Sequence, residues 1–146
     1  MFYSELNSFR CVLMFPFFMW PRQLVMNTFL TGRPEGDVWH DPGFPAITIP
    51  YHEMNDFFWS GHMGTCVMYI MEYFCHGEYF MGHFGLFVMV NEWLPMTFTK
   101  CHYIIDLYTG VCIGHWAFIN AEWASYILDV KFAGIGKDKR EYQHAH

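Results

Sequence analysis

The chain has 146 residues, of which 53% are hydrophobic, 21% aromatic and only 15% charged, and its formal net charge is −6. This length suits one compact domain. Soluble domains carry charges at about 25% of positions, so the composition predicts a membrane environment. An acidic chain without a basic stripe argues against a nucleic-acid partner. The five cysteines are odd in number and lack C-x-x-C spacing, which predicts reduced thiols rather than a disulfide framework.

The first predicted element is the apolar run of residues 9–30, which is about one bilayer long and is expected to form a membrane span. Residues 1–8 lack the basic start of a signal peptide and no cleavage site follows, so we expect no removable signal. Pro16 and Pro21 would kink the helix, which membrane helices tolerate. Arg22 would have to form an ion pair or reach the membrane interface.

A long loop is predicted at residues 31–59, where prolines and glycines cluster between Gly32 and Pro50. Connections of this length are uncommon in compact domains and are often functional. The next span is predicted at residues 60–75, which begin with Ser60, a favourable helix N-cap, and continue with apolar residues at helical spacing. At about 1.5 Å per residue this helix is barely long enough to cross a bilayer.

Two further helices are predicted. Residues 79–98 have the length of a membrane span, and Gly82 and Gly85 within them permit close contact with another helix. Residues 102–128 form the last long helix, and residues 129–146 form a basic, solvated tail.

These elements predict an all-α fold, a polytopic membrane helix bundle with about four spans in a single catalytic domain, residues 1–146. The basic tail places both termini in the cytoplasm by the positive-inside rule. The chain is then expected in an endomembrane of the Golgi or endoplasmic reticulum, or in the plasma membrane, with the loop 31–59, His62 and His102 on the lumenal or extracellular face.

Two motifs carry the predicted chemistry. His102 and Asp106 are four residues apart and would share one helix face, so the carboxylate could orient the imidazole. Ser60-Gly61-His62 lies forty residues before His102, and one helix, a short turn and a returning helix would bring the two histidines to the same depth. A nucleophile, an orienting carboxylate and a general acid would then be together. Separately, each motif is also explained by chance spacing or by an N-cap with an interfacial histidine.

The segments FFWSGHMGT and HYIIDL resemble the type 2 phosphatidic acid phosphatase superfamily, and are most similar to its sphingomyelin-synthase branch and to the plant phosphatidylcholine:diacylglycerol cholinephosphotransferases. The resemblance covers about residues 30–125. It implies that His102 attacks phosphorus to form a phosphohistidine, that Asp106 orients His102, and that His62 protonates the leaving alcohol. It also implies that Ser60 and the Gly61 amide hold the phosphate oxygens.

Departures from the phosphatase pattern favour head-group transfer over hydrolysis. Arg33-Pro34 matches the end of a Lys-x6-Arg-Pro element, but Met26 stands at the lysine position, and Met96 replaces an arginine six residues before the nucleophile. Lys100 is the cation nearest to the nucleophile in the sequence. The family is usually a six-span bundle, so the resemblance implies that two spans are missing from this chain.

The leading prediction is therefore transfer of a phosphocholine-like head group from a phospholipid to a lipid alcohol, without a metal or other cofactor. The residues expected to bind substrate are Ser60, Gly61, Lys100, Arg33 and Tyr103. Tyr103 would join Trp59, Phe57 and Phe58 in an aromatic wall for choline, although an interfacial aromatic belt also explains these residues.

The alternatives are a lipid phosphate phosphatase, a metal site of His62, His102 and Asp106, a non-catalytic membrane scaffold or truncated family member, and a soluble helical binding protein. The oligomeric state is left open by the sequence.

Overall fold

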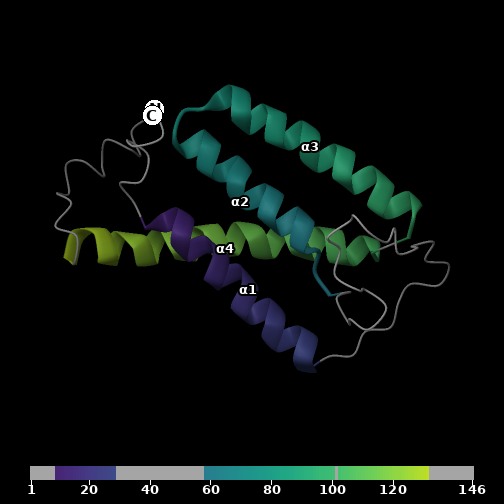
Figure 1. The fold of residues 1–146 in the computed structure, drawn as a ribbon, viewed down its shortest axis with the longest axis horizontal. Coiled ribbons are helices and arrows are strands. Elements are labelled where there is room, and N and C mark those ends of the chain that lie inside the picture. The colour runs from purple at the N-terminus through teal and green to yellow at the C-terminus, as the bar shows by residue number, and fades with distance from the viewer. Residues whose placement is uncertain (1–8, 29–57, 101, 132–146) are drawn as a thin grey trace, which may run out of the picture.

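The computed structural model describes residues 9–28, 58–100 and 102–131. In these ranges the chain forms four α-helices (Figure 1). Their bounds are Arg10–Thr28 for α1, Gly61–Cys75 for α2, Tyr79–Phe98 for α3 and Ile104–Lys131 for α4. Each helix begins and ends within three residues of a segment expected from the sequence, and α3 matches its expected bounds at both ends.

The longest helix, α4, is the element on which α1 and α2 both pack, whereas α3 packs mainly against α2 (Figure 1). The hairpin of α2 and α3 turns at Gly77, whose φ of 73° lies in the left-handed region that glycine adopts without strain. In Figure 1, α2 lies between α3 and α4.

A close approach of backbones fixes α2 on α4. A Cβ atom on Gly110 would lie 2.6 Å from the Ser60 carbonyl oxygen, and one on Gly114 would lie 2.5 Å from the carbonyl oxygen of Gly64. A Cβ atom on Gly64 would also clash with the Phe18 ring of α1. Glycines four residues apart on one helix face are a known device for such contacts. The spacing of Gly110 and Gly114 in the sequence is the signal from which this contact could have been predicted.

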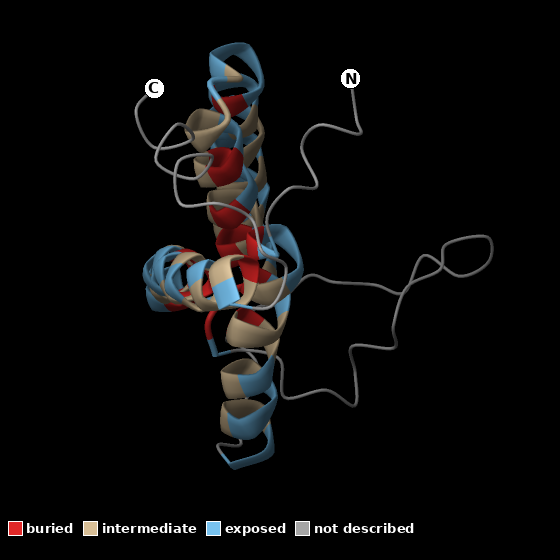
Figure 2. Cartoon of the chain, turned by 90° about the vertical axis from the view of Figure 1, so that its left-hand side faces the viewer, coloured by how far each residue is buried: buried red, intermediate tan, exposed pale blue. Residues whose placement is uncertain are grey.

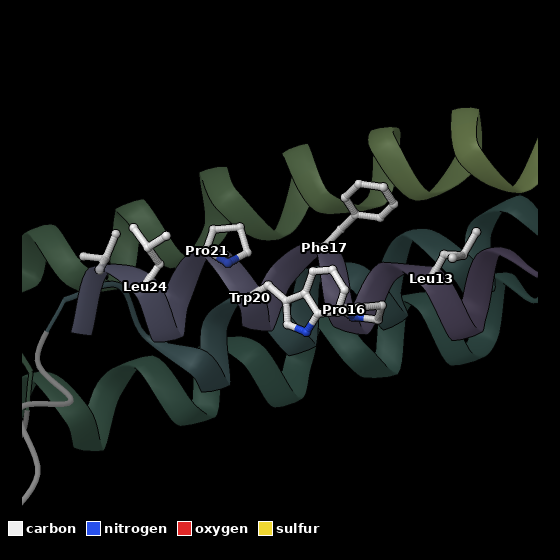
Figure 3. Close-up of a pocket in the computed structure, with 7 residues that line it drawn as sticks. Leu13, Pro16, Phe17, Trp20, Pro21 and Leu24 are labelled. Atoms are coloured by element: carbon white, nitrogen blue, oxygen red, sulfur yellow. The ribbon is translucent and has the colours of Figure 1, made fainter. Parts of the chain in front are cut away.

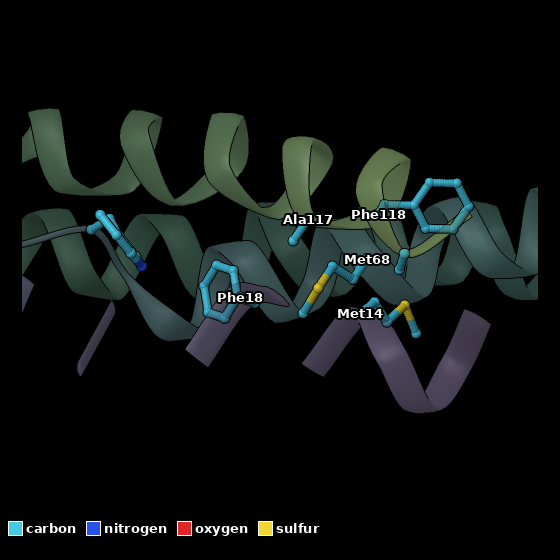
Figure 4. Packing of buried hydrophobic residues seen from close by; sticks show 7 residues of the cluster. Met14, Phe18, Met68, Ala117 and Phe118 are labelled. Atoms are coloured by element: carbon cyan, nitrogen blue, oxygen red, sulfur yellow. The ribbon is translucent and has the colours of Figure 1, made fainter. Parts of the chain in front are cut away.

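The apolar core forms where α1, α2 and α4 cross. Figure 4 shows Met14 and Phe18 of α1 facing Met68 of α2 and Ala117 and Phe118 of α4. In Figure 2 the buried residues gather at the helix crossings and the exposed residues cover the outer faces. Many of those exposed residues are large and apolar, especially along α3, where Gly82 is the buried residue.

Buried charge also joins the helices. The Arg10 guanidinium bonds both carboxylate oxygens of Glu72, with Nε 2.7 Å from Oε2 and Nη2 3.2 Å from Oε1, and its Nη1 lies 2.5 Å from Glu122 Oε2. His76 Nε2 lies 3.0 Å from Glu72 Oε1. Burial acts to lower the pKa of Arg10, but the hydrogen bonds and charges of the two carboxylates outweigh it, and the pKa is raised. One arginine of α1 thus links α2 and α4.

The predicted membrane bundle of four spans is wrong, and so is the predicted location of the chain as an integral membrane protein. Of the helices in the described ranges, none combines the length and the hydropathy that crossing a bilayer requires. Helix α2 has only 15 residues, against about 20 for a span. The prediction failed because a low share of charged residues does not by itself make a helix apolar enough: Tyr, Trp and His lower the mean hydropathy of the longer helices.

Candidate functional site

Ser60 begins α2 and connects it to the first turn of α4. Its backbone is extended, and its buried hydroxyl accepts a hydrogen bond from the Met63 amide at 3.4 Å, which is an N-cap. The Ser60 amide donates to the Asp106 carbonyl at 2.8 Å. The Ser60-Gly61-His62 motif therefore lies beside the start of α4, so the structure brings together the regions of the two motifs.

The end of α3 reaches the same place. Ser60 Oγ contacts Met96 Sδ at 4.0 Å. Position 96 is the one at which the resembled phosphatases carry arginine, and here it borders Ser60 without supplying charge. The left-handed backbone of Trp59, with a φ of 43°, and its buried indole N–H, which has no acceptor in the described structure, mark local strain next to the N-cap. Such strain is often concentrated at functional sites.

A cation that sequence reasoning did not assign to the site lies against the start of α2. The guanidinium of Arg22, on α1, packs over Gly61, with Cζ and Nη2 both 3.4 Å from the position that a Cβ atom would occupy. The first amides of a helix have no intrahelical acceptor and carry partial positive charge, so a helix start is a natural anion site. Arg22 adds a full charge there. The signal for this contact in the sequence is that Arg22 lies within an apolar run, where a charged side chain requires a partner.

His62 is the second residue of α2, and its side chain is exposed to solvent. It therefore follows directly the glycine over which Arg22 packs. An imidazole at this position can exchange protons with a substrate or with water beside the anion site, as general acid and base catalysis requires.

His102 and Asp106 do not share a helix face as expected. Helix α4 begins at Ile104, so His102 lies two residues before it in a bend, and its side chain is half-buried. Asp106 Oδ2 instead accepts a hydrogen bond from the Tyr103 amide at 3.0 Å. An acidic residue three positions into a helix that bonds the capping amide is one half of a capping box. The observed hydrogen bond of Asp106 thus stabilises the start of α4.

The Asp106 carboxylate is buried, with 2% of the residue exposed. Burial raises its pKa from 3.8 to about 6, and the hydrogen bond from the Tyr103 amide opposes this rise. The carboxyl therefore titrates near the lower edge of the physiological range.

The remaining predicted substrate contacts lie at the connection between α3 and α4 or outside the described residues. Lys100 is exposed and has a φ of 54°, and Tyr103 is also exposed. Arg33 lies outside the described residues, as does Phe57. Within the described ranges, no three His, Cys, Asp or Glu side chains are grouped as a metal site requires, so the rival metal site of His62, His102 and Asp106 is not assembled.

An apolar groove of about 520 Å³ runs along α1 (Figure 3). Its volume lies within the range of small-molecule sites, about 300–1,000 Å³. Apart from the indole N–H of Trp20, the lining side chains carry no polar group, so the groove can hold hydrocarbon. The lining residues are Leu13, Pro16, Phe17, Trp20, Pro21, Leu24 and Val25.

No protein-family profile matches the sequence, and no curated protein or solved structure is detectably similar to it.

Proposed function

We propose that this protein transfers a phosphocholine-like head group from a phospholipid to a lipid alcohol through a phosphohistidine. The observation that carries the proposal is the packing of Arg22 over Gly61 at the start of α2, immediately before His62. A full positive charge, helix amides and an imidazole at one point suit a phosphate ester. The hydrogen bond between the Ser60 amide and the Asp106 carbonyl supports a contribution of His102 to the same site.

In the proposed first step, a ring nitrogen of His102 attacks phosphorus and the bond from phosphorus to the diacylglycerol oxygen breaks. His62 gives a proton to that oxygen, and diacylglycerol leaves. In the second step, His62 takes the proton of the acceptor alcohol, whose oxygen displaces the imidazole from phosphorus. Arg22 balances the charge of the phosphate oxygens throughout. Positioning and charge dominate phosphoryl transfer, and a positioned general acid adds about 10²- to 10⁴-fold.

The lipid nature of the substrate is supported by the groove on α1, the helix that also carries Arg22. An apolar groove of this volume accepts part of an acyl chain. The resemblance of the two motifs to head-group transferases supports the same class of reaction.

The proposal is tested with purified protein and phosphatidylcholine labelled in the choline, offered separately ceramide and a diacylglycerol whose acyl chains differ from those of the phosphatidylcholine, in mixed micelles. Labelled product lipid and an acid-labile phosphoprotein are expected. His102→Ala should abolish both, whereas His83→Ala, which removes an exposed histidine of α3, should change neither. Labelled phosphocholine in place of product lipid would identify hydrolysis with water as the acceptor. If His102→Ala kept full activity, the assignment of the nucleophile would be wrong.

A non-catalytic scaffold is the second candidate, and the hydrogen bond of Asp106 favours it. A carboxylate that bonds the Tyr103 amide has a structural explanation that needs no imidazole. This candidate predicts that His62→Ala and His102→Ala leave every phenotype of the protein unchanged, while Asp106→Ala unfolds the start of α4.

A further inference from the structure

Helix α3 carries a stripe of apolar residues, with one polar member, on the side facing away from α2. Its apolar members are 49–80% exposed, whereas Gly82 and Gly85, on the other side of the helix, pack against Phe74 and Ile70 of α2. The stripe consists of Phe80, Phe84, Phe87, Asn91, Leu94 and Phe98.

The spacing of the stripe is that of a coiled-coil seam. Its members follow one another by four, three, four, three and four residues, which is the alternation of the a and d positions in a heptad repeat. Gly82, Met89 and Met96 then fall at the f positions, directly opposite the seam, and all three are buried or half-buried. The seam and the face that packs on α2 are therefore separate sides of α3.

One polar residue interrupts the seam. Asn91 occupies an a position and is exposed. A single asparagine at an a position reduces stability but specifies alignment and oligomeric state in paired helices. The flanking e and g positions next to it, Val88 and Val90, carry no charge that could choose a partner or an orientation. In a pair formed through this seam, Asn91 would therefore set the register.

A second copy of the chain is the occupant that fits this surface. Covering the exposed parts of the five apolar side chains removes about 600 Å² per copy from water, hence about 1,200 Å² for a pair, which reaches the lower end of stable protein interfaces. The seam has no cation for an anionic lipid surface, and the chain as a whole carries a net charge of −6. We propose that two copies of this protein pair through these seams in parallel, with each Asn91 side chain hydrogen-bonded to its counterpart.

The parallel orientation follows from the polar position. In a parallel pair the two Asn91 amides face each other, and each supplies a donor and an acceptor. In an antiparallel pair centred on the stripe, Asn91 would face Phe87, which leaves a buried amide without a partner.

Sedimentation equilibrium over a wide concentration range tests the pairing. The wild-type chain should show twice its mass of 17.4 kDa, and Phe84→Glu should reduce this to the monomer. Ile119→Glu is the matched control, because Ile119 of α4 is 52% exposed against 55% for Phe84; it should leave the pair intact. Circular dichroism of both variants checks that the helices remain. A wild-type monomer at all concentrations, or a pair unaffected by Phe84→Glu, would overturn the proposal. A monomer that binds neutral phosphatidylcholine vesicles only while Phe84 is present would assign the surface to lipid instead.

The orientation has its own test. Asn91→Cys should form an intermolecular disulfide on mild oxidation, well above the background of the native cysteines in the wild-type chain. An antiparallel pair would instead cross-link a mixture of Asn91→Cys and Phe87→Cys chains, and the Asn91→Cys chain alone would remain uncoupled. Asn91→Leu should broaden the mass distribution, because the seam loses the residue that selects its register.

Discussion

Replacing Gly110 by alanine tests the contact that holds the candidate site together. The added Cβ atom would lie 2.6 Å from the Ser60 carbonyl oxygen and 3.1 Å from the Ser60 amide nitrogen, which are backbone atoms that cannot rotate away. Crowding a packed contact costs about 1–3 kcal/mol. Loss of the hydrogen bond from the Ser60 amide to the Asp106 carbonyl adds about 0.5–1.5 kcal/mol. The higher helix propensity of alanine offsets this loss by about 1 kcal/mol of stability. We expect Gly110→Ala to lower the free energy of unfolding by about 0.5–3.5 kcal/mol.

Urea denaturation followed by far-ultraviolet circular dichroism measures this loss. Gly61→Ala is the control, because the Cβ atom added there would lie at an ordinary contact distance, 3.4 Å, from the Arg22 guanidinium, and its stability should stay close to wild type. If Gly110→Ala were more stable than the wild type by the amount of the propensity gain, the close approach of α2 and α4 would be refuted.

Three further predictions follow from buried or charged groups. Arg10→Leu leaves two carboxylates without their guanidinium and should cost about 3–5 kcal/mol in a denaturation assay; a stability equal to wild type would contradict the network. The raised pKa of Asp106 means that the folded state holds its proton more tightly than the unfolded chain does. The contribution of this group to the free energy of unfolding is therefore full below pH 3.8 and is lost as the pH rises through about 6. Asp106→Asn, whose carbonyl can still accept the Tyr103 amide, should remove that decline from a series of melts across this range, and an unchanged decline would assign it to other groups. Arg22→Gln should lower kcat/KM for head-group transfer by about 10- to 100-fold, and the kcat/KM of Arg22→Lys should lie between those of the wild type and Arg22→Gln. Equal kcat/KM values for all three proteins would exclude Arg22 from phosphate binding.

Local signals predicted the helices well, because capping and apolar spacing act over one or two turns. Ser60 was identified as an N-cap from its residue type and the apolar pattern that follows it. The expectation that a helical hairpin returns the second motif to the first needed only segment lengths, and the hydrogen bond from the Ser60 amide to the Asp106 carbonyl shows the two regions in contact. The phosphotransfer chemistry drawn from the motifs stays a prediction.

The pairing of His102 with Asp106 illustrates a limit of spacing arguments. Four residues apart means one face only if both residues lie within the helix, and α4 begins at Ile104, between them. The start of the helix depends on which group accepts a hydrogen bond from the Tyr103 amide, and here that group is the Asp106 carboxylate. Residue spacing alone does not show at which residue a capping interaction starts the helix.

By itself, the sequence determined the helical segments, the N-cap at Ser60 and the candidate histidines. Only the tertiary structure decided that Arg22 lies over Gly61, because the crossing of α1 with α2 depends on side-chain packing between segments far apart in the chain. It also decided which apolar residues are covered. Composition counts the aromatic side chains, but burial depends on their positions around each helix, and α3 leaves most of its apolar residues exposed because it packs mainly against one neighbour.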